Sequence, residues 1–172
     1  MPTADEFRAA LDDSLTRLRT DRVEILDVHG INTPDLLELT LRPNGTMTAI
    51  RRAMDEGIVG HVGFSTHGPL ETILQAIRTG EFEAVNLHYF FFNQRNRPAV
   101  ELAAAMDMGV YIISPTDKGG QLFNPPPRLA ELCRPLTPIE FNQRWLLAQP
   151  DVHTLSLCAA SPTEIEAHLK GV

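Results

Sequence analysis

Short runs rich in β-branched residues alternate along the chain with longer runs whose apolar positions recur at helical spacing. Five runs of the first kind are predicted strands, at 23–29, 58–65, 84–90, 110–114 and 152–158. The segment before the first strand illustrates the second kind, because Phe7, Leu11 and Leu15 fall on one face of a helix. Strict alternation of strands and helices predicts a parallel sheet with helices outside it.

Capping signals mark where several helices begin. The segments 3–6, 137–140 and 161–164 each have Ser or Thr followed three residues later by Glu, so that hydroxyl and carboxylate can each bond a backbone N–H group. Further helices are predicted at 45–57, 69–80 and 97–108, with glycine at or just past their ends. The segment 116–136 is predicted to be a long loop with a short helix near 128–133.

This order, one helix and then five βα units in a single domain covering 1–172, fits two architectures. One is a doubly wound sheet and the other is part of a (β/α)8 barrel. Because a complete barrel typically needs about 250 residues, the second case would be a barrel short of three strands. In either case 23–29 and 152–158 would be unpaired edges, which favours self-association or a partner chain.

Composition narrows the function classes. The net charge is −7 and the 15 Lys and Arg residues are scattered, which argues against a nucleic-acid partner. No apolar run approaches the roughly 20 residues that span a bilayer, and the acidic N-terminus is unlike a signal peptide. A cytoplasmic protein without a membrane partner is expected. Cys133 and Cys158 form no CxxC pair, so no metal site is expected.

Polar side chains gather where the predicted strands end, which is where parallel βα proteins place their chemistry. These residues are His29, Ser65, Thr66, Asn86, His88, Ser114 and Cys158. Their common position suggests a site but names no reaction. His29 taken alone is more often a structural hydrogen-bonding residue, although a neutral imidazole there could orient or polarise a substrate carbonyl.

Other motifs leave alternatives open. No Gly-x-Gly-x-x-Gly or Walker-type loop follows any strand, so the Rossmann fingerprint is absent. Gly119 and Gly120 could form a phosphate-binding loop or a flexible turn. The run 90–92, three phenylalanines, could line a pocket or cover an incomplete core. The remaining candidates, His61, His67 and His153, lack ligand-like spacing and are interpreted as surface or core histidines.

Several segments, in order, resemble the aldo-keto reductase family. They are 14–29, which ends in VEILDVH, 57–66 (GIVGHVGFST), 84–89 (AVNLHY), 109–115 (GVYIISP), 144–150 (RWLLAQP) and the SPTEIE helix near the end. The resemblance implies a (β/α)8 barrel that binds NADPH or NADH and reduces a small-molecule carbonyl substrate by hydride transfer. The family's catalytic set is Tyr, Asp, Lys and His.

The resemblance also implies roles for individual residues. His29 corresponds to the histidine that orients the carbonyl. Ser65, Thr66 and Asn86 correspond to residues that hold the nicotinamide carboxamide. Three more, Ser114, Thr116 and Lys118, fall in the loop that runs along the pyrophosphate.

Departures from the family pattern qualify these expectations. The chain begins at the helix before the fourth strand, so the first three βα units and their Asp, Tyr and Lys are missing from it. Tyr89 and Tyr111 lie on the wrong strands to replace that tyrosine, and Ile113 stands where an aromatic residue often stacks on the nicotinamide. Little carbonyl reduction is therefore expected from this chain alone. A non-catalytic assembly module or an inactive remnant is the alternative.

The residues expected to contact the adenosine end of the cofactor also differ from the family pattern. Lys, Ser, Arg and Asn are typical of the family where this chain has Cys158, Ala159, Glu164 and His168. Glu164 would repel a 2′-phosphate, which argues against NADPH and favours NADH or weak binding of the cofactor.

Overall fold

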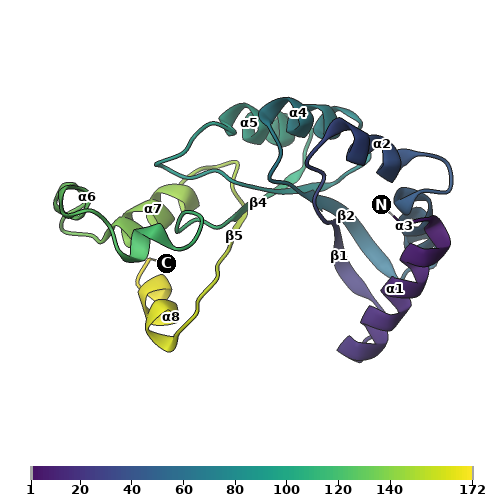
Figure 1. Cartoon of the computed structure of the whole chain (residues 1–172), viewed down its shortest axis with the longest axis horizontal. Helices are drawn as coiled ribbons and strands as arrows, with labels where there is room; N and C mark the ends of the chain where they lie inside the picture. The colour runs from purple at the N-terminus through teal and green to yellow at the C-terminus, as the bar shows by residue number, and fades with distance from the viewer. Residues whose placement is uncertain (1, 172) are drawn as a thin grey trace.

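A computed structural model describes residues 2–171 and contains one parallel sheet (Figure 1). Its strands are β1 (Val23–Val28), β2 (Val59–Ser65), β3 (Ala84–Leu87), β4 (Gly109–Ile113) and β5 (Thr154–Ser156), paired in sequence order. The predicted parallel sheet is confirmed. The third strand is shorter than predicted because the chain turns back on itself after it, with Phe90 and Asn93 exchanging backbone hydrogen bonds.

Eight α-helices accompany the sheet within residues 2–171. They are α1 (Ala4–Leu18), α2 (Pro34–Leu41), α3 (Thr46–Asp55), α4 (Leu70–Arg78), α5 (Arg97–Ala105), α6 (Pro127–Leu132), α7 (Pro138–Leu147) and α8 (Pro162–Leu169). A short 3-10 turn, η1 (Gln121–Phe123), precedes α6. None of these helices has both the length and the apolar character needed to cross a membrane.

The capping signals at 3–6 and 137–140 form complete capping boxes. The third differs, because the Glu164 carboxylate accepts from the backbone N–H of Ala160 at 2.6 Å instead of from the cap residue Ser161. The sequence pattern missed α2, which begins at the Thr33 cap and has Pro34 in its first turn. With only 8 residues, α2 is too short to show a repeated apolar stripe.

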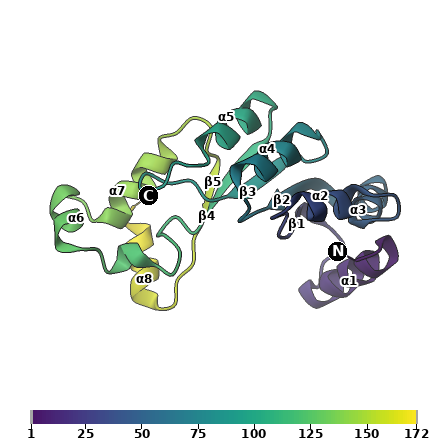
Figure 2. The ribbon, with the colours of Figure 1, turned by 45° about the horizontal axis from the view of Figure 1, so that its top comes forward.

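The sheet is curled and its helices lie on the convex side (Figures 1 and 2). The strand residues that face the helices form the main core, among them Val28, Val62, Phe64, Val85, Leu87, Val110 and Ile112. The opposite, concave face is open within residues 2–171, and Ile25 on it is 51% exposed. Because the strand order never reverses, the fold is a partial (β/α)8 barrel and not a doubly wound sheet.

Candidate functional site

Hydrogen bonds connect the end of β1 to the end of β2, and these bonds position His29. The Ser65 carbonyl accepts from the backbone N–H groups of Gly30 and Ile31 at 3.0 and 3.1 Å. Ser65 Oγ accepts from Gly30 N at 3.3 Å and lies 3.1 Å from His29 Nδ1. When the Ser65 hydroxyl donates to His29 Nδ1, the neutral ring carries its proton on Nε2. In this tautomer the exposed imidazole presents an N–H group that can donate to a carbonyl oxygen.

The carboxyl ends of the strands form a rim of the sheet, and Thr66 is buried beneath it. Its side chain is 1% exposed, and its hydroxyl donates to the Ile31 carbonyl at 2.7 Å and accepts from Gly68 N at 3.0 Å. The bond to Ile31 joins the loop that follows β1 to the loop that follows β2, and the bond from Gly68 lies within the second loop. A cofactor contact by Thr66 remains a prediction. Its hydroxyl oxygen keeps one lone pair that could accept from a ligand, but the residue is buried.

Asn86 shares a sheet register with Ser65, on the neighbouring strand β3. Its side-chain amide oxygen is buried and has no hydrogen-bond partner within residues 2–171. A buried polar atom left without a partner costs about 1–3 kcal/mol. A ligand that brings an N–H donor, such as a carboxamide, would satisfy it, so Asn86 fits the predicted contact with nicotinamide.

Neither tyrosine of the chain is placed as an acid at this rim. Tyr89 is buried in the core against Trp145, with ring centres 5.4 Å apart. The Tyr111 hydroxyl donates to Asp27 Oδ1 at 3.4 Å, across the concave face. The Asp27 carboxylate lies against Gly63, and a Cβ at position 63 would collide with it. Burial and the Asp27 charge raise the pKa of Tyr111 to about 12, so it holds its proton too tightly to be an effective donor at neutral pH.

The loop after β4 borders a cavity of about 500 Å³. Ser114, Thr116, Asp117, Gly119, Gly120 and Phe123 line one side, and Cys158, Ala159, Ala160 and Glu164 line the other. Lys118 is exposed beside it. Ser114 and Asp117 have φ values of 51° and 64°, a left-handed conformation that non-glycine residues adopt rarely and often at functional sites.

Gly119 and Gly120 belong to an ordered turn of this loop. The N–H of Gly120 donates to the Asp117 carbonyl at 2.8 Å, and both glycines have positive φ. The N–H groups of Lys118 and Gly120 already donate within this turn, so its expected contact with a phosphate group stays a prediction.

The four residues that differ from the family pattern at the adenosine end of the expected cofactor site lie in different places. Cys158, Ala159 and Glu164 line the cavity. His168 is 5% exposed and lies beneath it, accepting from Gln143 Nε2 at 2.7 Å through Nδ1 and donating to the Cys158 carbonyl at 3.1 Å through Nε2. His168 is therefore a structural link between α7, α8 and the end of β5.

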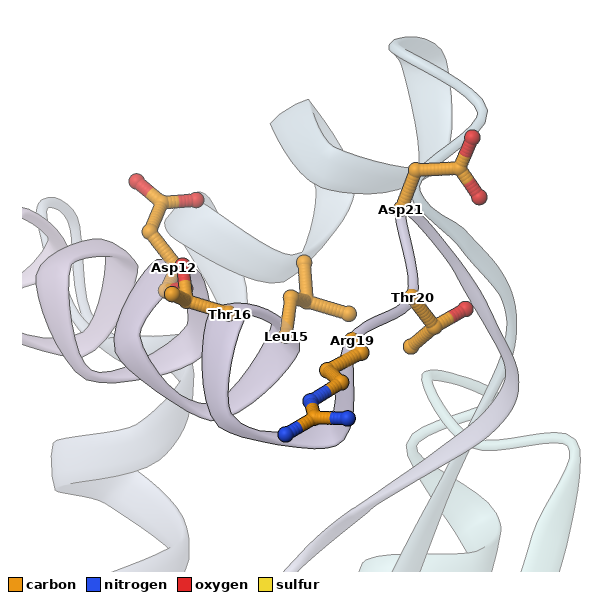
Figure 3. Close-up of a pocket in the computed structure, with 6 residues that line it drawn as sticks. All are labelled: Asp12, Leu15, Thr16, Arg19, Thr20 and Asp21. Carbon is orange, nitrogen blue, oxygen red and sulfur yellow. The ribbon is translucent and has the colours of Figure 1, made fainter.

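The charged groups at the start of β1 do not converge on a common point. A cavity of about 640 Å³ lies where α1 leads into β1, at the opposite end of the strands. Figure 3 shows that its Asp12 and Asp21 carboxylates and the Arg19 guanidinium point in different directions. Phe90 is a core residue, and Phe91 packs edge-on against Phe141 and Trp145, so this run covers the core.

Sequence reasoning missed two pairs of side chains from different elements. His67 Nδ1 and His88 Nε2, which follow β2 and β3, are 2.7 Å apart. The Asp27–Tyr111 pair is the other, and its sequence signal is a carboxylate in an otherwise apolar strand. Residues 2–171 contain no group of three or more His, Cys, Asp or Glu side chains arranged to hold a metal ion.

The curled parallel sheet and its rim define a partial (β/α)8 barrel protein. Residues 3–171 match the model of the aldo/keto reductase family, and the chain belongs to that family.

Individual relatives are distant. The chain is 20% identical to the oxidoreductase YqkF of Bacillus subtilis (strain 168), over 98% of this chain and 61% of that protein. Its fold is similar to that of the holo form of aldo-keto reductase AKR11C1 from Bacillus halodurans, with a TM-score of 0.78, 21% identity and coverage of 99% of this chain and 60% of that one. The glycerol dehydrogenase AKR11B4 from Gluconobacter oxydans has a TM-score of 0.74, 16% identity and corresponding coverage of 98% and 59%. The chain thus spans about three-fifths of the length of these relatives.

Proposed function

We propose that this chain supplies the carbonyl-orienting and cofactor-binding part of an NAD(P)H-dependent reductase of small carbonyl compounds, with NADH preferred. The proposal rests on the imidazole of His29, which Ser65 contacts at its Nδ1 atom. The amide oxygen of Asn86 lies at the same end of the sheet and has no hydrogen-bond partner within residues 2–171. The cofactor, when bound, supplies the hydride. His29 would donate a hydrogen bond to the carbonyl oxygen and so fix the face of the substrate that is presented.

The proton donor would come from outside residues 2–171. Tyr89 is buried in the core, and Tyr111 is directed at Asp27 with a pKa of about 12. Loss of a general acid typically lowers a rate by about 10²–10⁴-fold. Carbonyl reduction by this chain alone is therefore expected to be slow or undetectable, even when the cofactor binds.

Cofactor binding tests the proposal directly. NADH titrated onto the full chain should give a saturable change in nicotinamide fluorescence. Asn86→Leu should weaken it by about tenfold, because the carboxamide then loses a hydrogen-bonding partner worth about 1 kcal/mol or more. His153→Gln, at the opposite end of the sheet, is the matched control. Absence of binding at millimolar NADH would contradict the proposal.

A second candidate function, assembly with another copy of the chain, is favoured by the β1 edge. Ile25 and Leu18 are 51% and 67% exposed, and an apolar groove of about 290 Å³ runs between α1 and β1. An unpaired strand edge beside exposed apolar side chains is a surface on which another strand can pair. Self-association at this edge is compatible with cofactor binding at the rim.

A further inference from the structure

Helix α7 carries two neighbouring buried amide side chains, Asn142 and Gln143, which are 0% and 1% exposed. Asn and Gln are mostly surface residues, and a buried amide needs hydrogen-bond partners. The Gln143 amide contacts His168, which in turn donates to a backbone carbonyl at the end of β5. The Asn142 amide points elsewhere and contacts two loops at the carboxyl ends of the strands.

Asn142 joins the loop after β3 to the loop after β4. Its Oδ1 atom accepts from the backbone N–H of Phe91 at 2.8 Å, and its Nδ2 atom donates to the Pro115 carbonyl at 2.6 Å. Phe91 and Pro115 lie 51 and 27 residues from Asn142, so each bond connects distant parts of the chain. Loss of the amide would leave a backbone group in each loop without this partner.

The bond to Pro115 is the hydrogen bond that joins the loop after β4 to another element. Among residues 2–171, the other hydrogen bonds of segment 115–120 stay within 114–123. Asp117 in this segment has a φ of 64°, a conformation that is costly for a residue other than glycine. Such a conformation persists only where the surrounding structure fixes it, and the Asn142 amide supplies a fixed point.

Segment 115–120 also contributes one wall of the cavity of about 500 Å³. The opposite wall, which includes Glu164, is linked to α7 through His168 and Gln143. Two consecutive residues of one helix therefore hold the two walls, since Asn142 holds the first and Gln143 the second. The position of α7 sets the separation of the walls.

We propose that Asn142 is a positioning residue, which holds segment 115–120 in the conformation that shapes this cavity and does not itself touch the ligand. Without the amide, the segment would sample other conformations, and fewer chains would present the cavity in its observed shape. Apparent affinity for a ligand falls in proportion to that fraction. The effect on the loop stands on the two hydrogen bonds. Its consequence for the cofactor rests on the proposed function.

Backbone hydrogen exchange in segment 115–120 of the full chain tests the effect on the loop, and NADH titration tests its consequence. Asn142→Leu removes both bonds, so exchange should become about tenfold faster and NADH should bind about tenfold more weakly. Asn142→Asp keeps an acceptor for Phe91 but, when ionised, has no donor for Pro115. Burial favours the protonated carboxyl, whose O–H can donate. This variant should therefore approach the parent near pH 6 and resemble Asn142→Leu near pH 8.

Asn96→Leu is the matched control. Asn96 is 3% exposed and its amide donates to the His88 carbonyl at 2.9 Å, so this variant also loses a buried amide but keeps the bond to Pro115. Thermal unfolding of each variant defines the temperatures at which it is folded. Should Asn142→Leu fail to fold, the pH dependence of exchange in Asn142→Asp provides the same test.

Parent-like exchange of segment 115–120 in folded Asn142→Leu would overturn the proposal. Equal losses of NADH affinity in Asn142→Leu and Asn96→Leu would overturn it as well, because the loss would then follow from the missing amide alone. If the parent chain binds no NADH, the reductase proposal fails. The exchange rates then decide by themselves whether Asn142 holds the loop.

Discussion

Glu164 bears on the choice between NADH and NADPH. Its carboxylate lines the cavity at the start of α8 and accepts from the backbone N–H of Ala160 at 2.6 Å. It therefore places a negative charge at the cavity and occupies an N–H group that a phosphate could otherwise bind. Under the proposed function, both effects act against the 2′-phosphate of NADPH.

Glu164→Arg should reverse this preference. The variant replaces a repulsive charge with an attractive one, so NADPH binding should tighten by about tenfold, equivalent to about 1.4 kcal/mol, while NADH binding changes little. Fluorescence titration of both nucleotides measures the ratio. Glu166→Arg is the matched control, since Glu166 is exposed on the same helix. An unchanged ratio in Glu164→Arg would show that the adenosine end lies elsewhere.

Asp27 makes stability depend on pH. Burial raises the pKa of Asp27 above its ordinary value of 3.8, and the bond from Tyr111 offsets only part of this. The native state therefore holds the Asp27 proton more tightly than the unfolded state does. The contribution of Asp27 to the free energy of unfolding is largest in acid and is lost as pH rises through the folded-state pKa.

Asp27→Asn should stabilise the chain at neutral pH, because it removes a partly buried charge and keeps an acceptor for the Tyr111 hydroxyl. The carboxyl is partly exposed, so screening limits the gain to less than about 1 kcal/mol. Urea unfolding at several pH values measures it. The difference from the parent should vanish below about pH 3, where the carboxyl is protonated in both states. Asp21→Asn, at an exposed position, should show no such pH-dependent gain.

At the scale of elements, side-chain hydrogen bonds as well as apolar packing connect α7 and α8 to the end of β5. His168 on α8 accepts from Gln143 on α7 and donates to the Cys158 carbonyl after β5. The Gln143 amide is itself 1% exposed. The cavity wall formed by residues 158–160 and Glu164 therefore depends on these two hydrogen bonds.

His168→Ala should lower the free energy of unfolding by about 2 kcal/mol, since it leaves the buried Gln143 amide without its partner. NADH affinity should fall with it, because the wall is no longer held. Glu166→Ala, an exposed position on α8, provides the comparison and should change stability by less than about 0.5 kcal/mol. If the two variants are equally stable, the link does not hold α8 in place.

For the whole molecule, the open concave face and the β1 edge are the features that bear on association in solution. Parallel sheets are normally covered on both faces, whereas this sheet has helices on its convex face only within residues 2–171. The free edge next to α1 combines unpaired backbone groups with exposed apolar side chains.

The chain is accordingly expected to self-associate at tens of micromolar concentration, as measured by light scattering after gel filtration. Ile25→Lys should shift the population toward the monomer, because a charge on an edge strand opposes pairing. Ile165→Lys on α8 is a close control, with 52% exposure compared with 51% for Ile25. Equal association in both variants would place the interface away from β1.

The sequence by itself determined the order and type of most elements, since these depend on local periodicity and caps. Phe7, Leu11 and Leu15 define α1 without reference to the rest of the chain, and the Thr3 cap begins the helix as predicted. The sequence did not predict the short helix α2, because its 8 residues are too few to show a repeated apolar pattern. The motif order also indicated the family, and the family match over residues 3–171 confirms it.

The alternation of elements fitted both a doubly wound sheet and a barrel segment, and the family resemblance indicated the barrel. The tertiary structure confirmed it, because strand order and curvature arise from packing between units. It alone joined His67 to His88 and Tyr111 to Asp27, partners that lie 21 and 84 residues apart. Such contacts depend on how segments distant in the sequence pack together, which a local pattern of residues does not show. Strand register set Asn86 beside Ser65 and left its amide oxygen without a partner, as the proposed nicotinamide contact requires.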